Sequence, residues 1–253
     1  MINRGLMEKA AYEIWLPTCF IGALFFGFEA LLAYVLPMYT EDFVDSFKQI
    51  EFLRTFISAM LGTDLAGNIG PTTFMAFAWV HPVVLSVVWA HAVICCTRMP
   101  AGEIDRGTAD ILLGWPVGRW EILRSEPFAW ACAEMLLMLL GIAGNMVGSL
   151  AIDEALRPDP TRRAVAVANL FCLYLLVGAI GWLAAAWSDR RGWAMAVVFA
   201  FLLGTFLLNY LAELWEPAKQ VAFLGPMYYY KPLEVIRDGV VPVRDMTVLF
   251  SGA

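Results

Sequence analysis

Two carboxylates and two histidines lie within the apolar stretches of this sequence, and both residue types can move protons or hold metals: Glu29, Glu134, His81 and His91. A carboxylate and an imidazole form a general acid–base pair when they lie within hydrogen-bond reach of each other. His81 and His91 share one apolar stretch at a spacing that puts them close to opposite sides of a helix. They cannot form one metal site alone, and the sequence contains no spaced ligand motif, so no metal site is expected.

Glu29 and Glu134 are candidates for a translocation path, because a carboxylate inside a membrane usually faces water or a protein interior. A hydrogen bond to a neighbouring helix, or snorkelling to the membrane surface, is the alternative. The sequence has neither a Gly-x-x-x-x-Gly-Lys-Ser/Thr phosphate loop nor a Gly-x-Ser-x-Gly nucleophile motif. The chain is therefore not expected to hydrolyse ATP itself, and any catalytic pair would have to come from the two carboxylates and the two histidines.

A polar segment, residues 103–119, separates two of the apolar stretches and reads EIDRGTADILLGWPVGR. The Thr108 hydroxyl is predicted to cap a short helix, and residues 111–113 (Ile-Leu-Leu) to form an apolar knob on it. Pro116 is predicted to end the helix, since proline cannot continue it without breaking a backbone hydrogen bond. A compact helix lying across the membrane face suits a groove on a partner protein and can pass a push to the two flanking spans.

This segment resembles the cytoplasmic coupling region of type-2 ABC (ATP-binding cassette) transporter permeases, whose pattern is roughly Glu-x-x-x-Gly-Thr-x-Glu-x-Leu-Leu-x-x-Pro-x-Ser-Arg. The residues that carry the resemblance are Glu103, Gly107, Thr108, Asp110, Leu112, Leu113, Pro116 and Arg119, with Asp110 in place of the usual Glu. The resemblance implies that these residues dock on a separate ATPase subunit. ATP and magnesium belong to that partner, and no cofactor is expected in this chain. Ser125-Glu126 departs from the family, which often has Gly-Lys there.

The composition defines the class of protein without any resemblance. Hydrophobic residues make up 60% of the 253 residues and charged residues 16%, and mean hydropathy is +0.68. A soluble domain could not bury so much apolar surface. A bilayer core of about 30 Å needs about 20 apolar residues in a helix, and five stretches qualify: 17–36, 73–97, 127–152, 164–188 and 192–212. We therefore predict one all-α integral membrane domain, residues 1–253, with a coupling loop at 98–126.

Two amphipathic segments lie outside these spans. Residues 6–16 are predicted to form an interfacial helix that leads into the first span, and residues 42–61 an external interfacial helix. Gly144 and Gly148 form a Gly-x-x-x-Gly pair in the third span, which lets two helices approach closely. Packing within the chain is preferred to a dimer seam at this pair. The net charge of −6 is spread without a basic patch, so no nucleic-acid partner is expected.

The end of the chain resembles the family as well, through Pro226, Tyr229, Pro232 and Leu233 in the pattern Ser-Pro-Phe-x-Tyr-Tyr-x-Pro-Leu. In the family this segment precedes a sixth span, and we expect the natural polypeptide to continue past Ala253 with that span. Lysine and arginine are divided almost evenly between the two sides of the predicted topology, so charge alone does not orient the protein. The resemblance places residues 98–126 in the cytoplasm and the protein in the cytoplasmic (inner) membrane.

The implied function is that of a permease subunit, which exports or extracts an unidentified substrate and is driven by a separate ATPase. A second permease protomer, identical or homologous, and membrane lipid are the other expected partners. The transport path would lie between two protomers, along spans one, two and five. Two alternatives remain: a non-transporting ABC membrane subunit that relays ATPase motion to an extracytoplasmic partner, and an intramembrane enzyme.

Overall fold

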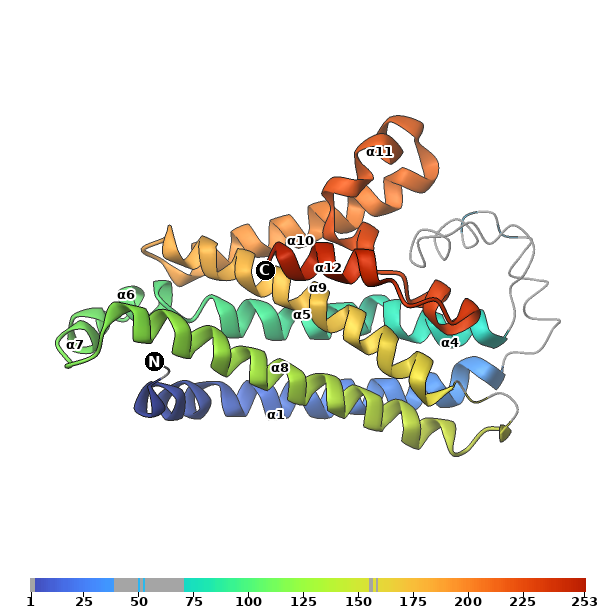
Figure 1. The fold of residues 1–253 in the computed structure, drawn as a ribbon, viewed down its shortest axis with the longest axis horizontal. Helices are drawn as coiled ribbons and strands as arrows, with labels where there is room; N and C mark the ends of the chain where they lie inside the picture. The colour runs from blue at the N-terminus through green and yellow to red at the C-terminus, as the bar shows by residue number, and fades with distance from the viewer. Residues whose placement is uncertain (1–2, 39–49, 51, 53–70, 155–156, 158) are drawn as a thin grey trace.

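A computed structural model of the chain describes residues 3–38, 50, 52, 71–154, 157 and 159–253. The described residues form helices and connecting turns and no β-strand, and the long helices run along the longest axis of the molecule (Figure 1). Within the described part of the chain, five helical segments are long and apolar enough to cross a membrane. The predicted all-α membrane fold is confirmed. The predicted external helix 42–61 lies, apart from Ile50 and Phe52, outside the described residues.

The first span is longer than predicted. Helix α1 runs without a break over Arg4–Val35, with Asn3 as its cap and Pro17 inside it, and the 3-10 turn η1 (Leu36–Met38) follows. The interfacial helix predicted at 6–16 and the span predicted at 17–36 are therefore parts of one continuous helix. The proline removes one backbone hydrogen bond, but the buried face continues across it, from Ala10 and Ile14 to Ile21 and Phe25. Packing of that face keeps the two parts in one helix.

The second span, predicted as one helix over 73–97, consists of α4 (Pro71–Val80) and α5 (Pro82–Cys96). The break falls at His81, whose φ of −54° and ψ of 132° are not helical. A proline disfavours the helical conformation in the residue before it, and Pro82 does so here. The Nδ1 atom of His81 then accepts a hydrogen bond from the backbone N–H of Val83 at 3.3 Å and caps α5.

The third span also begins earlier than expected. Helix α8 covers Arg119–Ser149 with Pro127 inside it, whereas the span was predicted at 127–152 and the coupling loop as far as residue 126. Gly118 is the cap residue, and its N–H donates to the Glu121 carboxylate at 3.3 Å, which starts the helix at Arg119. The loop is thus only 97–118, and it holds two short helices, α6 (Ala101–Asp105) and α7 (Ala109–Leu113).

The fourth and fifth spans match their predicted ranges closely. Helix α9 covers Pro160–Ala186, and the Asp159 carboxylate caps it by accepting from the N–H groups of Thr161 and Arg162 at 2.8 and 3.1 Å. Helix α10 covers Arg191–Leu214. The end of the bundle that carries α6 and α7, hereafter the α7 end, also holds the tight connection between α9 and α10 (Figure 1).

Helices α1 and α8 lie side by side in the closest helix pair of the bundle (Figure 1). A Cβ atom added to Gly144 would lie 2.2 Å from the Phe26 carbonyl oxygen, and one added to Gly148 would lie 2.1 Å from that of Ala30. Neither glycine can accept a side chain without moving a helix backbone. The prediction that this Gly-x-x-x-Gly pair serves packing within the chain is confirmed.

Exposed tryptophans gather at the α7 end. Trp115 follows α7, Trp120 is in the first turn of α8, Trp187 directly follows α9, and Trp193 is in the first turn of α10. All four side chains are exposed. Tryptophan is enriched where a membrane meets water, so this group of four exposed tryptophans is typical of one membrane–water boundary.

The last part of the chain folds back on the bundle through short helical turns. They are α11 (Glu216–Val221), η3 (Ala222–Leu224), η4 (Pro226–Tyr229), the π-helical turn η5 (Glu234–Asp238) and α12 (Val243–Ser251). Asn169 of α9 holds the Tyr-Tyr-Lys-Pro stretch: its amide donates to the Tyr229 carbonyl at 3.2 Å and accepts from the Lys231 N–H at 3.1 Å. Helix α12 then lies against α9 (Figure 1).

Candidate functional site

Glu103 is the centre of a polar cluster at the α7 end. The Lys9 ammonium of α1 lies 2.8 Å from its Oε1, and the Arg106 guanidinium lies 2.9 Å from the same oxygen. The Thr108 hydroxyl donates to its Oε2. Only 5% of the Glu103 side chain is exposed. One buried carboxylate therefore connects the amino-terminal part of α1 with α6 and with the start of α7.

The charges around Glu103 keep its carboxyl ionised. Burial by itself raises the pKa of this group, because it disfavours the charged form. The hydrogen bonds from Lys9 and Thr108, together with the charges of Lys9 and Arg106, outweigh burial and hold the pKa below its ordinary value. The cluster is consequently intact at neutral pH.

The spacing of Glu103, Gly107 and Thr108 has a backbone explanation. Helix α6 ends with Gly107 at a φ of +69°, a left-handed conformation that glycine adopts without strain. The Gly107 N–H bonds the Ile104 carbonyl at 3.0 Å and the Thr108 N–H bonds the Glu103 carbonyl at 2.9 Å, which is the Schellman pattern of a helix end. This turn brings the Thr108 hydroxyl to the Glu103 carboxylate. The predicted capping role of that hydroxyl is wrong, since it makes no capping bond to α7.

The predicted apolar knob divides into an exposed and a buried part. Leu112 is only 5% exposed and packs in a small cluster with Leu6, Met99 and Ile122. The expectation that it is exposed for docking is wrong, because it faces α1 and α8. Ile111 and Leu113, on either side of it, are 63% and 55% exposed.

The other predicted docking residues lie on the outer side of α7 and after it. Asp110, Pro116 and Arg119 are exposed. Helix α7 already ends at Leu113, where the Gly114 N–H bonds the Asp110 carbonyl at 2.9 Å, so Pro116 is not the residue that stops it. The eight predicted docking residues therefore divide into two groups. Glu103 and Leu112 are buried and support the segment from inside, and the exposed residues form its outer surface.

A second polar contact, which the sequence did not predict, lies directly beneath this segment. The Arg98 guanidinium follows α5 and donates to Glu13 of α1 and to Glu126 of α8. The Arg98 side chain is 6% exposed and that of Glu126 is 4% exposed. The Ser125 hydroxyl also accepts from the Asn3 N–H at 3.0 Å. The departure from the family pattern at Ser125-Glu126 was the one signal in the sequence for this contact. Both residues hold α8 against other helices: Ser125 against the start of α1, and Glu126 against the end of α5.

A family model described as ABC-2 family transporter protein matches residues 15–238, which include the α6–α7 segment and most of all five candidate spans. The chain belongs to this family. It is a type-2 ABC transporter permease and a multi-pass membrane protein. A search of curated proteins and a search of solved structures gave no match.

The two intramembrane carboxylates of the permease lie away from the α6–α7 segment. Glu29 of α1 accepts a hydrogen bond from the Asn145 amide of α8 at 2.8 Å, so the predicted helix–helix hydrogen bond is confirmed for this residue. Glu134 of α8 lies 3.3 Å from Nδ1 of His91 on α5. Both carboxylates have no exposed surface. The sequence offered no signal for the His91–Glu134 pair beyond the presence of both residues in apolar stretches.

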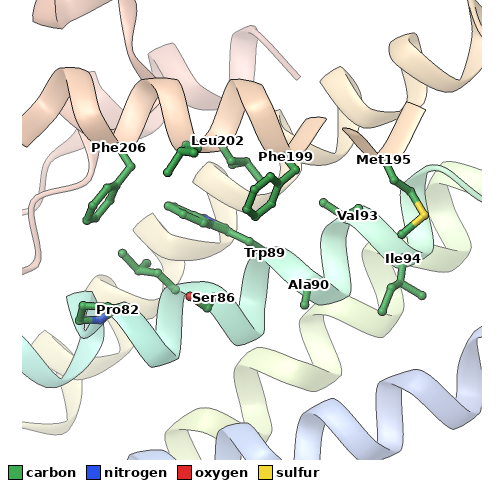
Figure 2. Close-up of a pocket in the computed structure, with 12 residues that line it drawn as sticks. Pro82, Ser86, Trp89, Ala90, Val93, Ile94, Met195, Phe199, Leu202 and Phe206 are labelled. Atoms are coloured by element: carbon green, nitrogen blue, oxygen red, sulfur yellow. The ribbon is translucent and has the colours of Figure 1, made fainter. Parts of the chain in front are cut away.

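The permease also has an apolar groove of about 410 Å³ between α5 and α10. Figure 2 shows Trp89 of α5 lying along it, opposite Phe199, Leu202 and Phe206 of α10. Trp89 and Phe206 pack edge to face with ring centroids 6.1 Å apart. Ser86 is the polar hydroxyl residue at its edge. The groove lies between spans two and five, two of the three spans that the family resemblance assigned to the transport path.

Proposed function

We propose that this permease moves an unidentified substrate out of the cytoplasm, or out of the membrane, using ATP hydrolysed with magnesium on a separate ABC ATPase subunit. It works in the cytoplasmic (inner) membrane beside a second permease protomer, identical or homologous. The observation that carries the proposal is the Glu103 cluster, which joins an exposed apolar helix to the membrane spans. Residues 103–119 lie in the cytoplasm in this arrangement.

The exposed residues of the α6–α7 segment form the docking surface for the ATPase. Ile111 and Leu113 present apolar side chains that are mostly exposed, and Trp115 beside them is 49% exposed. Asp110 and Arg119 provide charged groups of both signs at the edge. An apolar centre with a polar rim is the usual composition of a protein–protein contact.

The buried residues of the same segment transmit the motion of the ATPase. A displacement of α7 is carried to α1 through the Lys9–Glu103 contact, and to α8 through the packing of Leu112 on Ile122. Arg98 links the same two helices to the end of α5. Three spans therefore move with the docking helix, as a coupling device requires.

The substrate path follows the groove between α5 and α10. Its lining of tryptophan, phenylalanine and leucine favours an apolar substrate, or the apolar tail of an amphiphile. Glu29 and Glu134, which have no exposed surface, stand outside this path and support the packing of the helices. An intramembrane enzyme would need a catalytic pair that touches substrate, and the buried His91–Glu134 pair does not. The external helix predicted at residues 42–61 would suit the non-transporting alternative, and apart from Ile50 and Phe52 it lies outside the described residues.

The test is capture of the ATPase by the purified permease. Leu113→Asp places a charge on the docking surface, and the expected result is loss of the ABC ATPase that co-purifies with the wild-type permease from native membranes. Val240→Asp is the matched control, because Val240 is similarly exposed, at 51%, on the loop between η5 and α12. A Leu113→Asp variant that retained its ATPase and the wild-type rate of coupled hydrolysis would contradict the proposal.

A further inference from the structure

Four helices contribute a polar side chain to one cluster in the core of the bundle. These are Thr18 of α1, His91 of α5, Glu134 of α8 and Tyr174 of α9, and none is more than 3% exposed. The two nitrogens of the His91 ring are the centre of the cluster. Nε2 lies 2.9 Å from the Thr18 hydroxyl, and Nδ1 lies 3.1 Å from the Tyr174 hydroxyl and 3.3 Å from Glu134 Oε2.

The Thr18 hydroxyl determines which nitrogen of His91 carries a hydrogen. This hydroxyl has one hydrogen, and it donates that hydrogen to the Ile14 carbonyl at 2.7 Å. Toward His91 it can therefore only accept. The Nε2 atom of His91 must be protonated and must donate to Thr18.

The second ring nitrogen, Nδ1, has the Tyr174 hydroxyl as its donor at 3.1 Å. An unprotonated Nδ1 presents a lone pair, and an ionised Glu134 would present only lone pairs to it at 3.3 Å. A contact this short between two acceptors is unfavourable, and one added proton relieves it. That proton is either on the ring, which gives an imidazolium and a carboxylate, or on the carboxyl, which leaves both groups neutral.

The surroundings of Glu134 select the neutral arrangement. Neither carboxyl oxygen of Glu134 has a hydrogen-bond donor among the described residues, and the side chain has no exposed surface. An ionised carboxylate buried in this way would lack the donors that offset the loss of its hydration. A neutral Glu134 avoids this loss, and it also removes the repulsion between a carboxylate and the lone pair of His91 Nδ1.

We propose that Glu134, packed 3.3 Å from Nδ1 of His91 between α8 and α5, is a proton-binding site whose carboxyl is neutral while the two helices are in contact. The other titratable side chains near the pair are Cys95 and Cys96 of α5 and Tyr174 of α9, and Arg191 of α10 exerts its charge on Cys95. The thiols and the phenol are neutral at physiological pH, so the proton of Glu134 is the one whose loss would charge the cluster.

The position of the pair gives the proton a role in the motion of the permease. Helices α5 and α8 are the two helices that flank the α6–α7 segment, and Glu134 lies about two turns of α8 beyond Glu126, the partner of Arg98. Separation of the two helices lets water reach Glu134, whose carboxyl ionises in water at neutral pH. Opening of the α5–α8 contact therefore releases one proton, and closing it takes one up. This inference stands whether or not the proposed transport function is right.

Two spectroscopic measurements test the site on the full chain in lipid. The infrared difference spectrum between the wild type and Glu134→Gln should show the loss of a carbonyl band of a protonated carboxylic acid at neutral pH. Glu126→Gln is the matched control: it lies on the same helix and pairs with Arg98, so its difference spectrum should show the loss of carboxylate bands instead. Loss of carboxylate bands in Glu134→Gln would overturn the proposal.

The second measurement uses the fact that the chain has two histidines. His81→Asn keeps a capping acceptor at the start of α5, and it leaves His91 as the one histidine in a protein labelled with [¹⁵N]histidine. We expect the nitrogen shifts of a neutral ring protonated at Nε2, with Nδ1 accepting a hydrogen bond. Shifts of an imidazolium, or of a ring protonated at Nδ1 alone, would contradict it, and Glu134 stays unchanged in this experiment.

Discussion

The Lys9 ammonium lies 2.8 Å from the Glu103 carboxylate, and through this contact the first turns of α1 are joined to the short helix α6. Lys9 also lies 2.9 Å from Glu13 on its own helix, and Glu13 in turn accepts from Arg98. A continuous series of charged side chains therefore runs from the docking segment into the membrane spans. Its members are buried or partly buried, which weakens screening by solvent compared with a surface ion pair.

Low pH should weaken this series of contacts by protonating Glu103. The folded-state pKa of Glu103 lies below its ordinary value of 4.5, so the unfolded chain binds more protons at this group as pH falls through that range. The stabilisation is present above about pH 4.5 and is lost as the pH falls through the folded-state pKa. Glu103→Gln should thus unfold at a lower temperature than the wild type at neutral pH, and the difference should shrink in acid. Thermal unfolding of both proteins at neutral pH and below pH 4.5 measures this difference. An equal difference in unfolding temperature at the two pH values would contradict the stabilising role of the ionised Glu103.

Neighbouring residues of α7 should respond to substitution in opposite ways. Leu112→Ala removes a buried side chain from the contact with Leu6 and Ile122 and should lower the free energy of unfolding by about 2 kcal/mol or more. Ile111→Ala, on the exposed side, should leave the free energy of unfolding within about 0.5 kcal/mol of the wild type. The ATPase affinity should fall in Ile111→Ala, and both quantities can be measured on the same preparations. Equal stability losses in the two variants would refute the division of α7 into an inner and an outer side.

Hydropathy predicted the membrane class and the number of candidate spans. A bilayer requires long apolar helices, and stretches of about 20 apolar residues can be recognised directly in the sequence. It predicted the ends of the fourth and fifth spans closely but not those of the first three. Pro17 and Pro127, the predicted starts of two spans, both lie inside helices whose apolar faces pack on each other, while Pro82 does break its span. The sequence is similarly apolar around Pro17 and Pro82, yet only Pro82 breaks a helix, so tertiary packing, and not local preference, decided the outcome.

The candidate site was predicted in its location but not in its internal arrangement. The family pattern identified residues 103–119, and the Schellman turn at Gly107 accounts for one part of that pattern in physical terms. The partners Lys9, Arg98 and Glu126 come from distant parts of the chain, and no spacing rule connects them. Likewise, the periodicity of residues 111–113 could not tell that Leu112 alone faces inward, because the orientation of a five-residue helix is set by what lies beneath it.

The glycine contact between α1 and α8 should be intolerant of a single methyl group. Gly144→Ala would place a Cβ atom 2.2 Å from the Phe26 carbonyl oxygen, which a helix backbone cannot avoid without moving. We expect a loss of about 1–3 kcal/mol in the free energy of unfolding, as for other overpacked sites. Gly204→Ala on α10 is the control, because nothing lies within 4 Å of its added Cβ atom. It should be neutral or slightly stabilising, and denaturant titration in detergent measures both variants. Equal stabilities for the two would argue against the close α1–α8 contact.

Arg98 should be the residue of the polar series whose loss is most damaging, and whose loss a second substitution repairs. Arg98→Met leaves the Glu126 carboxylate 4% exposed and without its partner, and an unpaired buried charge costs about 3–5 kcal/mol. Glu13 is less affected, because it is 25% exposed and retains Lys9. Adding Glu126→Met removes the stranded charge and fills the space with an apolar side chain. The double variant should therefore recover most of the lost free energy of unfolding, since replacing a buried ion pair by apolar residues is often neutral.

The same double variant should fold normally but lose coupling to the ATPase. It keeps its exposed docking surface, but the end of α5 no longer pulls on α1 and α8 through a charged contact. ATP hydrolysis by the bound ATPase should continue while its dependence on the permease is lost. A double variant as unstable as Arg98→Met would mean that the ion pair itself stabilises the fold, and one that coupled normally would mean that Arg98 has no part in transmission.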